Sequence, residues 1–277
     1  MSQIDLLVTV RRDAAGRYYK NLAAFAEFNL TLATDVNEAF EVLESRENHV
    51  DVLVLDSHLD QAHQMILELR YTYPRLLIVV VDEEADFAIP GQADDVSTAP
   101  FTNDDLVRRI KRLMSERRLE TLRADTIPHV REFAKKLRRA VGETGKQQAA
   151  VSACRDLGYD YVAFYRVDTA EPLMLSLRAQ EGPPQLQAIA PQQATAEDIV
   201  GWVAQTGQSR VASPQDDVSY ALVAQGHLGS VACTAVGKPN AYGVIVAGRS
   251  QPGSITQQQV MLLELVSAQL AAVVTQE

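Results

Sequence analysis

The stretch that most constrains this sequence is residues 51–56, where four aliphatic side chains stand between two carboxylates. An unbroken Val-Leu-Val-Leu run, without polar alternation, predicts a strand buried on both faces at the centre of a parallel sheet. Asp56 then lies at the carboxyl end of that strand, where open α/β sheets place their reactive groups. The role of Asp56 therefore decides the function of the N-terminal half.

The length, composition and net charge of the chain limit the classes of protein to which it can belong. A chain of 277 residues that is 47% hydrophobic predicts two packed domains. A net charge of −10 argues against a binder of nucleic acid or anionic membranes, since both need a basic surface. We expect a cytoplasmic protein, because the sequence shows no membrane-spanning run, no signal peptide and only two distant cysteines, Cys154 and Cys233.

Apolar strands and helical patterns alternate through the first half, which predicts parallel βαβ units. The expected strands are residues 4–10, 30–34, 52–55, 76–81 and 95–98. The expected helices are residues 14–28, 36–45 after an Asp35 N-cap, 65–71, 85–89 and a long one capped by Thr102. The result is a doubly wound, five-stranded α/β domain over residues 1–118.

This half resembles a response-regulator receiver domain. The resemblance rests on residues 51–56, on the strand at 76–81, and on Ala-Asp-Asp at 93–95 leading to Ala-Pro-Phe at 99–101. It implies that Asp56 is the phospho-accepting aspartate. It also implies a histidine kinase as upstream partner.

The other positions of the resembled site depart from the family pattern. Arg11 and Arg12 stand where the family has an acidic pair that holds Mg²⁺, Asp82 replaces a Thr or Ser, and Ala99 replaces a Lys. Phosphoryl transfer to a carboxylate needs a metal and cations to offset the developing charge, and Mg²⁺ needs oxygen ligands. We expect a degenerate site, in which Asp56 is a vestigial phospho-acceptor or pairs with Arg11 or Arg12.

A second cluster follows Asp56 in the same loop. His58, Asp60 and His63 are residue types that bind metals. Their spacing matches no known signature, so we favour solvated loop residues over a metal site.

A helical connector is expected over residues 119–145. The helix before it carries a basic set, namely Arg108, Arg109, Lys111, Arg112, Arg117 and Arg118. These residues form either a contact patch or a solvated face paired with nearby carboxylates, and we favour the second. A further helix is expected at residues 130–141, with Gly142 and Gly145 at its end.

The second half groups strands with helices, which predicts an antiparallel α+β domain over residues 146–277. The expected strands are residues 161–167, 173–179, 210–212, 230–236 and 242–247. The expected helices are 147–157, 199–205 closed by Gly207, and a last one capped by Thr256, with 181–193 as loose chain.

This half resembles a GAF domain. The resemblance rests on residues 161–168, 199–207, 229–233 and 242–248, of which the Gly-Trp-Val-Ala-x-Thr-Gly segment at 201–207 is the most specific. It implies a small-molecule cavity, for which Arg210, Tyr220 and His227 are candidate ligand contacts. No cysteine is placed to attach a chromophore, and we expect Cys154 and Cys233 to be buried thiols. No cofactor is certain.

Together these features predict a non-enzymatic regulator whose output is a protein contact. The alternative is a working phospho-accepting response regulator of a phosphorelay, with the GAF domain as a ligand-binding effector. We also expect a homodimer held by the helices at 130–141 and 256–275, because Leu262, Leu265 and Val273 lie off the main apolar stripe of the last helix.

Overall fold

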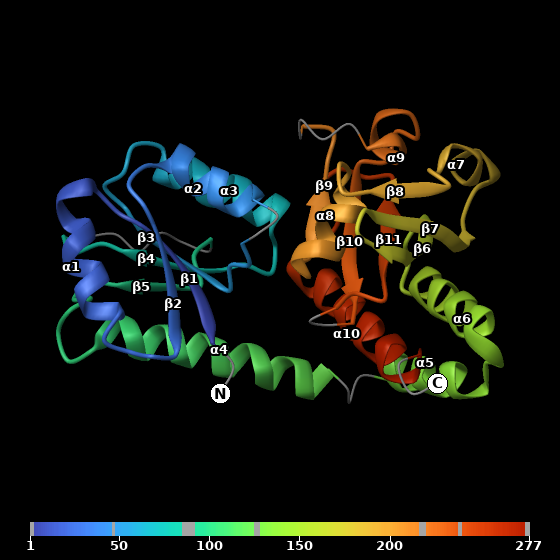
Figure 1. Ribbon diagram of the computed structural model, residues 1–277, viewed down its shortest axis with the longest axis horizontal. Helices are drawn as coiled ribbons and strands as arrows, with labels where there is room; N and C mark the ends of the chain where they lie inside the picture. The colour runs from blue at the N-terminus through green and yellow to red at the C-terminus, as the bar shows by residue number, and fades with distance from the viewer. Residues whose placement is uncertain are drawn as a thin grey trace. The chain divides into compact units, whose positions relative to one another are not determined.

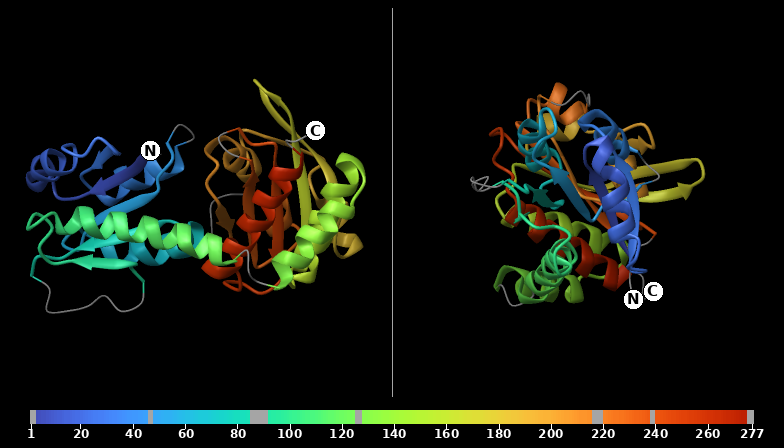
Figure 2. Two further views of the ribbon diagram at one scale, coloured as in Figure 1. Left: turned by 90° about the horizontal axis from the view of Figure 1, so that it is seen from below. Right: turned by 90° about the vertical axis from the view of Figure 1, so that its left-hand side faces the viewer.

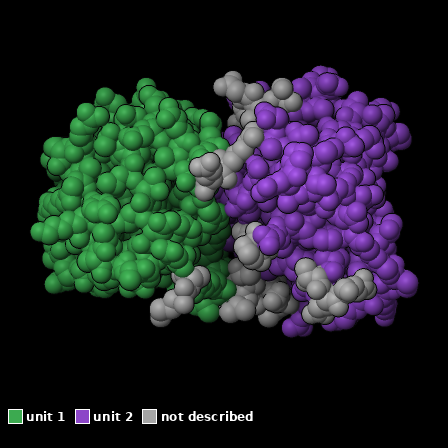
Figure 3. Space-filling view, viewed as in Figure 1, with its two compact units in different colours: residues 1–71, 76–120 green, residues 72–75, 121–277 purple. Residues whose placement is uncertain are grey.

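A computed structural model describes residues 3–45, 48–84, 92–124, 128–215, 220–237 and 240–274, and the side chains of residues 121–129 are not described. The expected helix at 85–89 lies outside these residues. No helix in the described ranges is both long and apolar enough to cross a lipid bilayer. The chain divides into two compact units, Met1–Tyr71 with Leu76–Glu120, and Thr72–Arg75 with Thr121–Glu277 (Figure 3).

The first unit is built on a five-stranded parallel sheet, as the sequence predicted (Figure 1). Its order is β2-β1-β3-β4-β5, with strands β1 (Ile4–Thr9), β2 (Phe28–Ala33), β3 (Val52–Asp56), β4 (Leu77–Val81) and β5 (Asp95–Ser97). Every residue of β3 and β4 is buried. Their continuous apolar runs are therefore explained by helices on both faces of the sheet.

Four helices of the first unit are described. They are α1 (Arg12–Leu22), α2 (Val36–Glu44), α3 (Ala62–Thr72) and α4 (Asp105–Ala124), with α1 and α4 against one sheet face and α2 and α3 against the other (Figures 1 and 2). Asp35 caps α2 as predicted, since its Oδ1 accepts the Glu38 N–H at 2.9 Å. Thr102 does not cap α4, because Asn103 and Asp104 both adopt left-handed conformations and delay the helix to Asp105.

The second unit holds a six-stranded antiparallel sheet of order β8-β7-β6-β11-β10-β9. Its strands are β6 (Tyr161–Ala170), β7 (Leu173–Glu181), β8 (Gln193–Thr195), β9 (Arg210–Ala212), β10 (Ser230–Val236) and β11 (Gly243–Arg249). β10 and β11 form the expected hairpin. Both edge strands, β8 and β9, have only three residues. Such short edges limit pairing with other chains.

Helices cover both faces of this sheet. The first group is α5 (Pro128–Arg139), α6 (Gly142–Asp156) and α10 (Gln257–Val274), and the second is α7 (Pro184–Ile189), α8 (Ile199–Thr206) and α9 (Ala221–Ala224) (Figure 1). Two sequence predictions were wrong here. Gly142 begins α6, with φ of +67°, instead of ending the previous helix. The stretch at 181–193 contains α7, which begins at Pro184, and the start of β8.

The extra apolar residues of α10 are used within the second unit. Val260, Leu263, Val266 and Leu270 face the main core, as predicted. Leu265 is 3% exposed and packs with Val130 of α5, while Leu262 lies against the same pair. Val273 packs against the main core. The second apolar stripe therefore contacts α5 and the core of this unit, so it is no longer an argument for a second chain.

Two glycines fix the position of α8. A Cβ on Gly201 would lie 1.8 Å from the Thr195 carbonyl oxygen, so α8 approaches β8 only because this residue has no side chain. Gly207 ends the helix with φ of +66°, and its N–H donates to the Val203 carbonyl at 2.9 Å. Both observations confirm that residues 201–207 encode close packing and helix termination.

Candidate functional site

The first candidate site lies where β1 and β3 end, on either side of the point at which the strand order of the parallel sheet reverses. Asp56 is the last residue of β3, and Arg11 follows β1 directly before α1. Arg11 Nε donates to Asp56 Oδ2 at 2.9 Å. The Asp56 side chain is 6% exposed and that of Arg11 is 52% exposed. Doubly wound sheets bind ligands at this position, but here two residues of the chain neutralise each other.

His58 supplies the remaining contacts of Asp56. The His58 backbone N–H donates to Asp56 Oδ1 at 3.0 Å, and His58 Nδ1 lies 3.2 Å from the same oxygen. Burial raises the pKa of Asp56, but the His58 N–H and the Arg11 guanidinium outweigh burial, so the pKa lies below its usual value. The hydrogen bond and charge of Asp56 raise the pKa of Arg11. Asp56 is therefore held as a carboxylate.

The other departures from the receiver pattern do not complete a metal site. Arg12 is exposed in the first turn of α1, and no ion pair joins it to a described residue. Asp82 follows β4, where its backbone N–H donates to the Ser97 carbonyl at 3.0 Å and its Oδ1 accepts the Glu84 N–H at 3.2 Å. Ala99 is exposed. Of the two arginines considered from the sequence, Arg11 pairs with Asp56.

The loop after Asp56 does not gather its metal-binding residue types. His58 turns back to Asp56, and its Nε2 lies 3.6 Å from Glu84. Asp60 and His63 are exposed. Within the described part of the chain, no three His, Cys, Asp or Glu side chains come together as a group that could hold a metal ion.

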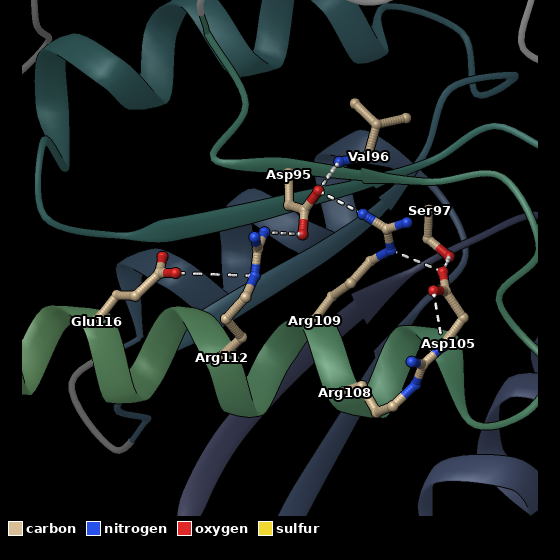
Figure 4. Close-up of polar contacts among 8 residues, drawn as sticks. All are labelled: Asp95, Val96, Ser97, Asp105, Arg108, Arg109, Arg112 and Glu116. Atoms are coloured by element: carbon tan, nitrogen blue, oxygen red, sulfur yellow. Dashed lines mark hydrogen bonds and ion pairs between the residues drawn. The ribbon is translucent and has the colours of Figure 1, made fainter.

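Four basic residues of α4 are neutralised within the first unit. Figure 4 shows Asp95 of β5 between two arginines, with Oδ1 2.6 Å from Arg109 Nη1 and Oδ2 2.6 Å from Arg112 Nη2. Arg109 Nε also donates to Asp105 at 2.7 Å, and the buried Ser97 hydroxyl donates to the same carboxylate at 2.8 Å. Lys111 pairs with Glu27, and Arg108 with Asp105. These pairs match the solvated, paired face that the sequence favoured over a contact patch.

The second candidate site is the face of the antiparallel sheet beneath α7, α8 and α9. Tyr161 and Tyr165 of β6 point to this face, because they alternate with Val162 and Phe164 of the opposite core. The Tyr165 hydroxyl donates to the Pro191 carbonyl at 2.8 Å, and that of Tyr161 to Gln180 at 2.8 Å. Burial raises the pKa of both phenols. This pair was not predicted from the sequence, although the period of two in β6 places both tyrosines on one face.

Of the three ligand candidates, two approach this face. Tyr220 is 4% exposed at the start of α9, and burial together with Tyr165 and Cys233 raises its pKa. Arg210 of β9 is the register partner of Cys233, and its guanidinium lies 5.2 Å from the centroid of Trp202. His227 is exposed, with φ of +52°, in the turn after α9. The candidates do not form one cluster.

Both cysteines are free and fully buried, as predicted. Cys154 of α6 lies in the core on the helix side of the sheet, and burial raises its pKa to about 12. Burial also raises the pKa of Cys233 on the opposite face. Neither thiol is accessible as a nucleophile.

A family model described as a GAF domain matches residues 147–275. These residues form a GAF domain. The match confirms the resemblance seen in the second half of the sequence and assigns that half to a family of signalling sensor and regulatory domains. It does not extend into the first unit. A search of curated proteins gave no match.

Solved structures are similar to about half of the chain. One is the GAF domain of an Acinetobacter phosphoenolpyruvate-protein phosphotransferase, at 18% identity, with a TM-score of 0.46 over 53% of this chain and 91% of that chain. Another is a free methionine-R-sulfoxide reductase from Neisseria meningitidis in complex with its substrate, at 16% identity, with a TM-score of 0.44 over 53% of this chain and 88% of that chain. A third is residues 122 to 287 of a methyl-accepting chemotaxis protein, at 17% identity, with a TM-score of 0.43 over 52% of this chain and 95% of that chain.

Proposed function

We propose that this chain is a non-enzymatic signal-transduction regulator, in which a receiver-like domain with a degenerate phosphorylation site is joined by helices to a GAF domain. The observation that carries the proposal is the 2.9 Å contact between Arg11 Nε and Asp56 Oδ2 at the carboxyl end of β3. The parallel order β2-β1-β3-β4-β5 supports the receiver-like interpretation, because it is a common doubly wound order. Output is a contact with another protein.

The chemistry of phosphoryl transfer explains why this contact matters. A carboxylate accepts a phosphoryl group when a metal and nearby cations offset the charge on the phosphoryl oxygens. Arg11 occupies one oxygen of Asp56, and His58 occupies the other. Arg11 and Arg12 repel Mg²⁺ from the place where acidic ligands would hold it. Asp56 is thus already neutralised by residues of the chain, and the two arginines disfavour a cation at the position of the acidic pair.

The test is exposure of the purified chain to acetyl phosphate and Mg²⁺, followed by intact mass measurement. We expect no phosphoryl adduct on the wild-type chain, and the same result for Asp56→Asn. The double variant Arg11→Asp with Arg12→Asp restores an acidic pair and serves as the positive comparison, with an adduct that depends on Asp56. A wild-type adduct that disappears in Asp56→Asn would refute the proposal.

A second function has one observation in its favour, namely that Asp56 keeps its position at the end of β3. In that alternative, a histidine kinase phosphorylates Asp56 within a phosphorelay, and the GAF domain acts as the effector that binds a ligand. The acetyl phosphate experiment separates the two functions directly.

For the GAF domain we propose a small, non-covalent ligand that contacts Arg210, Tyr220 or His227. Tyr220 lies beside other buried hydroxyl groups, which suit a polar, uncharged ligand. The absorption spectrum and native mass of the purified chain test this proposal. A covalently attached chromophore, or a bound ligand that none of three single alanine variants weakens, would contradict it.

We also propose a homodimer, with the helices of the second unit at its contact. Because Leu265 packs with Val130 inside this unit, the proposal now rests on the predominantly apolar sequence of α10, in which Met261 and Leu262 are only partly buried. Light scattering after size exclusion gives the mass in solution. A monomer at micromolar concentration would end this proposal.

A further inference from the structure

Helix α5 carries the largest set of cations that the second unit leaves exposed on one element. Its apolar residues Val130, Phe133 and Leu137 are 2%, 3% and 1% exposed and face the core. The outward side chains of this helix include one carboxylate, Glu132. The five exposed cations are Arg131, Lys135, Lys136, Arg138 and Arg139. The outer face of α5 is therefore strongly basic on a chain whose net charge is −10.

Ion pairs within the chain neutralise only some of these cations. Lys135 pairs with Glu132 at 2.7 Å and Lys136 with Asp156 at 2.5 Å, and all four side chains are at least half exposed. No ion pair joins Arg131, Arg138 or Arg139 to a residue in the described ranges. The contrast with α4 is direct, because there Arg108, Arg109, Lys111 and Arg112 all have acidic partners.

The helix dipole does not account for the pattern. Cations stabilise the last turn of a helix, which suits Lys136, Arg138 and Arg139. Arg131 and Lys135 lie outside the last turn, so the helix dipole does not stabilise their charges. Arg131, Lys135 and Arg138 follow the spacing i, i+4, i+7 and so share one side of the helix. A continuous basic stripe remains after the dipole is considered.

We infer that the outer face of α5 is a docking surface for an acidic segment of another protein. This inference rests on the proposed function only in taking the output of the chain to be a protein contact, and it does not depend on the state of Asp56. The stripe from Arg131 to Arg139 is about 12 Å long, which matches two turns of a helical segment. Short complementary charge patches of this kind steer and select protein partners.

Other polyanions fit the same surface less well. DNA and membranes extend far beyond about 12 Å, so they would also meet the acidic remainder of the chain. A membrane-bound basic helix needs its apolar face in the lipid, whereas that face of α5 is buried in the core. Val141, two residues beyond the end of α5, is 90% exposed and offers an apolar side chain close in sequence to Arg138 and Arg139. Exposed arginines next to an apolar side chain are typical of protein interfaces.

The experiment is fluorescence anisotropy with a fluorescein-labelled peptide of Glu and Ala, long enough for about three helical turns. The full chain should bind this peptide and not its Gln-for-Glu counterpart. The double variant Arg131→Glu with Arg138→Glu should bind at least about tenfold more weakly, because it replaces two attractions with two repulsions. The matched control is Arg12→Glu with Lys20→Glu, which changes the net charge equally at two other exposed cations and should keep the affinity.

The thermal unfolding midpoint of each variant shows that the fold is intact. If the charge reversals lower it, Arg131→Gln with Arg138→Gln replaces them and should still weaken binding severalfold. Equal losses in the α5 variant and the control, or no peptide binding by the wild-type chain, would overturn the inference. Binding of phosphatidylserine vesicles or duplex DNA through Arg131 and Arg138, without peptide binding, would also overturn it. None of these outcomes changes the acetyl phosphate result.

Discussion

The two candidate sites of this chain stabilise their buried polar side chains in opposite ways. At the carboxyl end of the central strand β3, Asp56 keeps its charge and is neutralised by Arg11, whose side chain is 52% exposed. On the face of the antiparallel sheet, Tyr161, Tyr165 and Cys233 are uncharged and fully buried. The phenol hydroxyls there donate to a backbone carbonyl and an amide oxygen. One site depends on paired charges near water, and the other on packing and neutral hydrogen bonds.

This difference predicts which perturbations each unit resists. Charge pairs near the surface contribute little to stability but respond to pH and salt. Close packing contributes much more and responds to the size of side chains. The second unit should therefore be sensitive to added atoms and the first to changes of charge.

The largest effect is expected from Gly201→Ala. The new Cβ would meet the Thr195 carbonyl oxygen at 1.8 Å, so α8 must move away from β8. We expect the free energy of unfolding of the second unit to fall by about 3 kcal/mol. Chemical denaturation monitored by the fluorescence of Trp202 measures it. Gly145→Ala in α6 of the same unit is the matched control, since its Cβ would lie 3.9 Å from its nearest neighbours and the change should be neutral or slightly stabilising. A similar loss in both variants would break the comparison.

A second effect is expected at alkaline pH. Burial raises the pKa values of Tyr165 and Tyr220 in the folded state, so they ionise more readily after unfolding. Their contribution is complete below the ordinary pKa of about 10 and is lost as the pH rises through the folded value, by about 1.4 kcal/mol for each phenol and pH unit. Unfolding midpoints above pH about 10 test this prediction. Tyr165→Phe should have a shallower alkaline slope, and an unchanged slope would contradict it.

A smaller effect with the opposite sign is expected at acid pH. The folded pKa of Asp56 is lowered, so its contribution is complete above the ordinary carboxyl pKa of about 4 and is lost as the pH falls through the folded value. Asp56→Asn should remove this part of the acid dependence, with a change in Tm of about 2 °C between neutral and acid pH. Scanning calorimetry over that range measures it. The alkaline slope should not change in this variant.

The smallest effects should separate the two arginines. Arg11→Ala removes the partner of Asp56 and should lower Tm by about 2 °C, and by less in high salt. Arg12→Ala removes an exposed side chain and should change Tm by less than about 1 °C. Equal shifts in the two variants would show that the Arg11 contact does not distinguish this site.

Much of the fold could be predicted because the strands differ in pattern. The all-apolar runs of β3 and β4 were located to within one residue, and the predicted bounds of β9 and β10 agree with the structure. Helix ends were harder to predict. Gly142 was interpreted as a helix end, but the same left-handed freedom lets the chain turn directly from α5 into α6. Pro184 is a residue type favoured at the start of a helix, but the glutamines around it led us to expect a loop where α7 lies.

The candidate sites divide in the same way. From the sequence, Asp56 was identified and either Arg11 or Arg12 was expected to pair with it. The sequence could not choose between them, because the directions of two adjacent side chains at a strand end depend on the local backbone conformation. Structure selects Arg11. In the structure, Arg210, Tyr220 and His227 lie in different surroundings. The apolar pattern of the strands could not predict this, because it does not determine the conformation of the loops. The unpaired cations of α5 could not be told from the paired ones of α4 without knowing where the carboxylates lie.

The two salt bridges of Asp95 give α4 a fixed pivot. Arg109 and Arg112 join this helix to β5 near its beginning, whereas the helix continues to Ala124. Twelve residues beyond Arg112 correspond to a rod of about 18 Å. A tilt of about 10° at the pivot moves the far end by about 3 Å, the size of a side-chain contact. A shift of Asp95 at the start of β5 that is too small to alter the sheet would therefore be enlarged toward the end of α4.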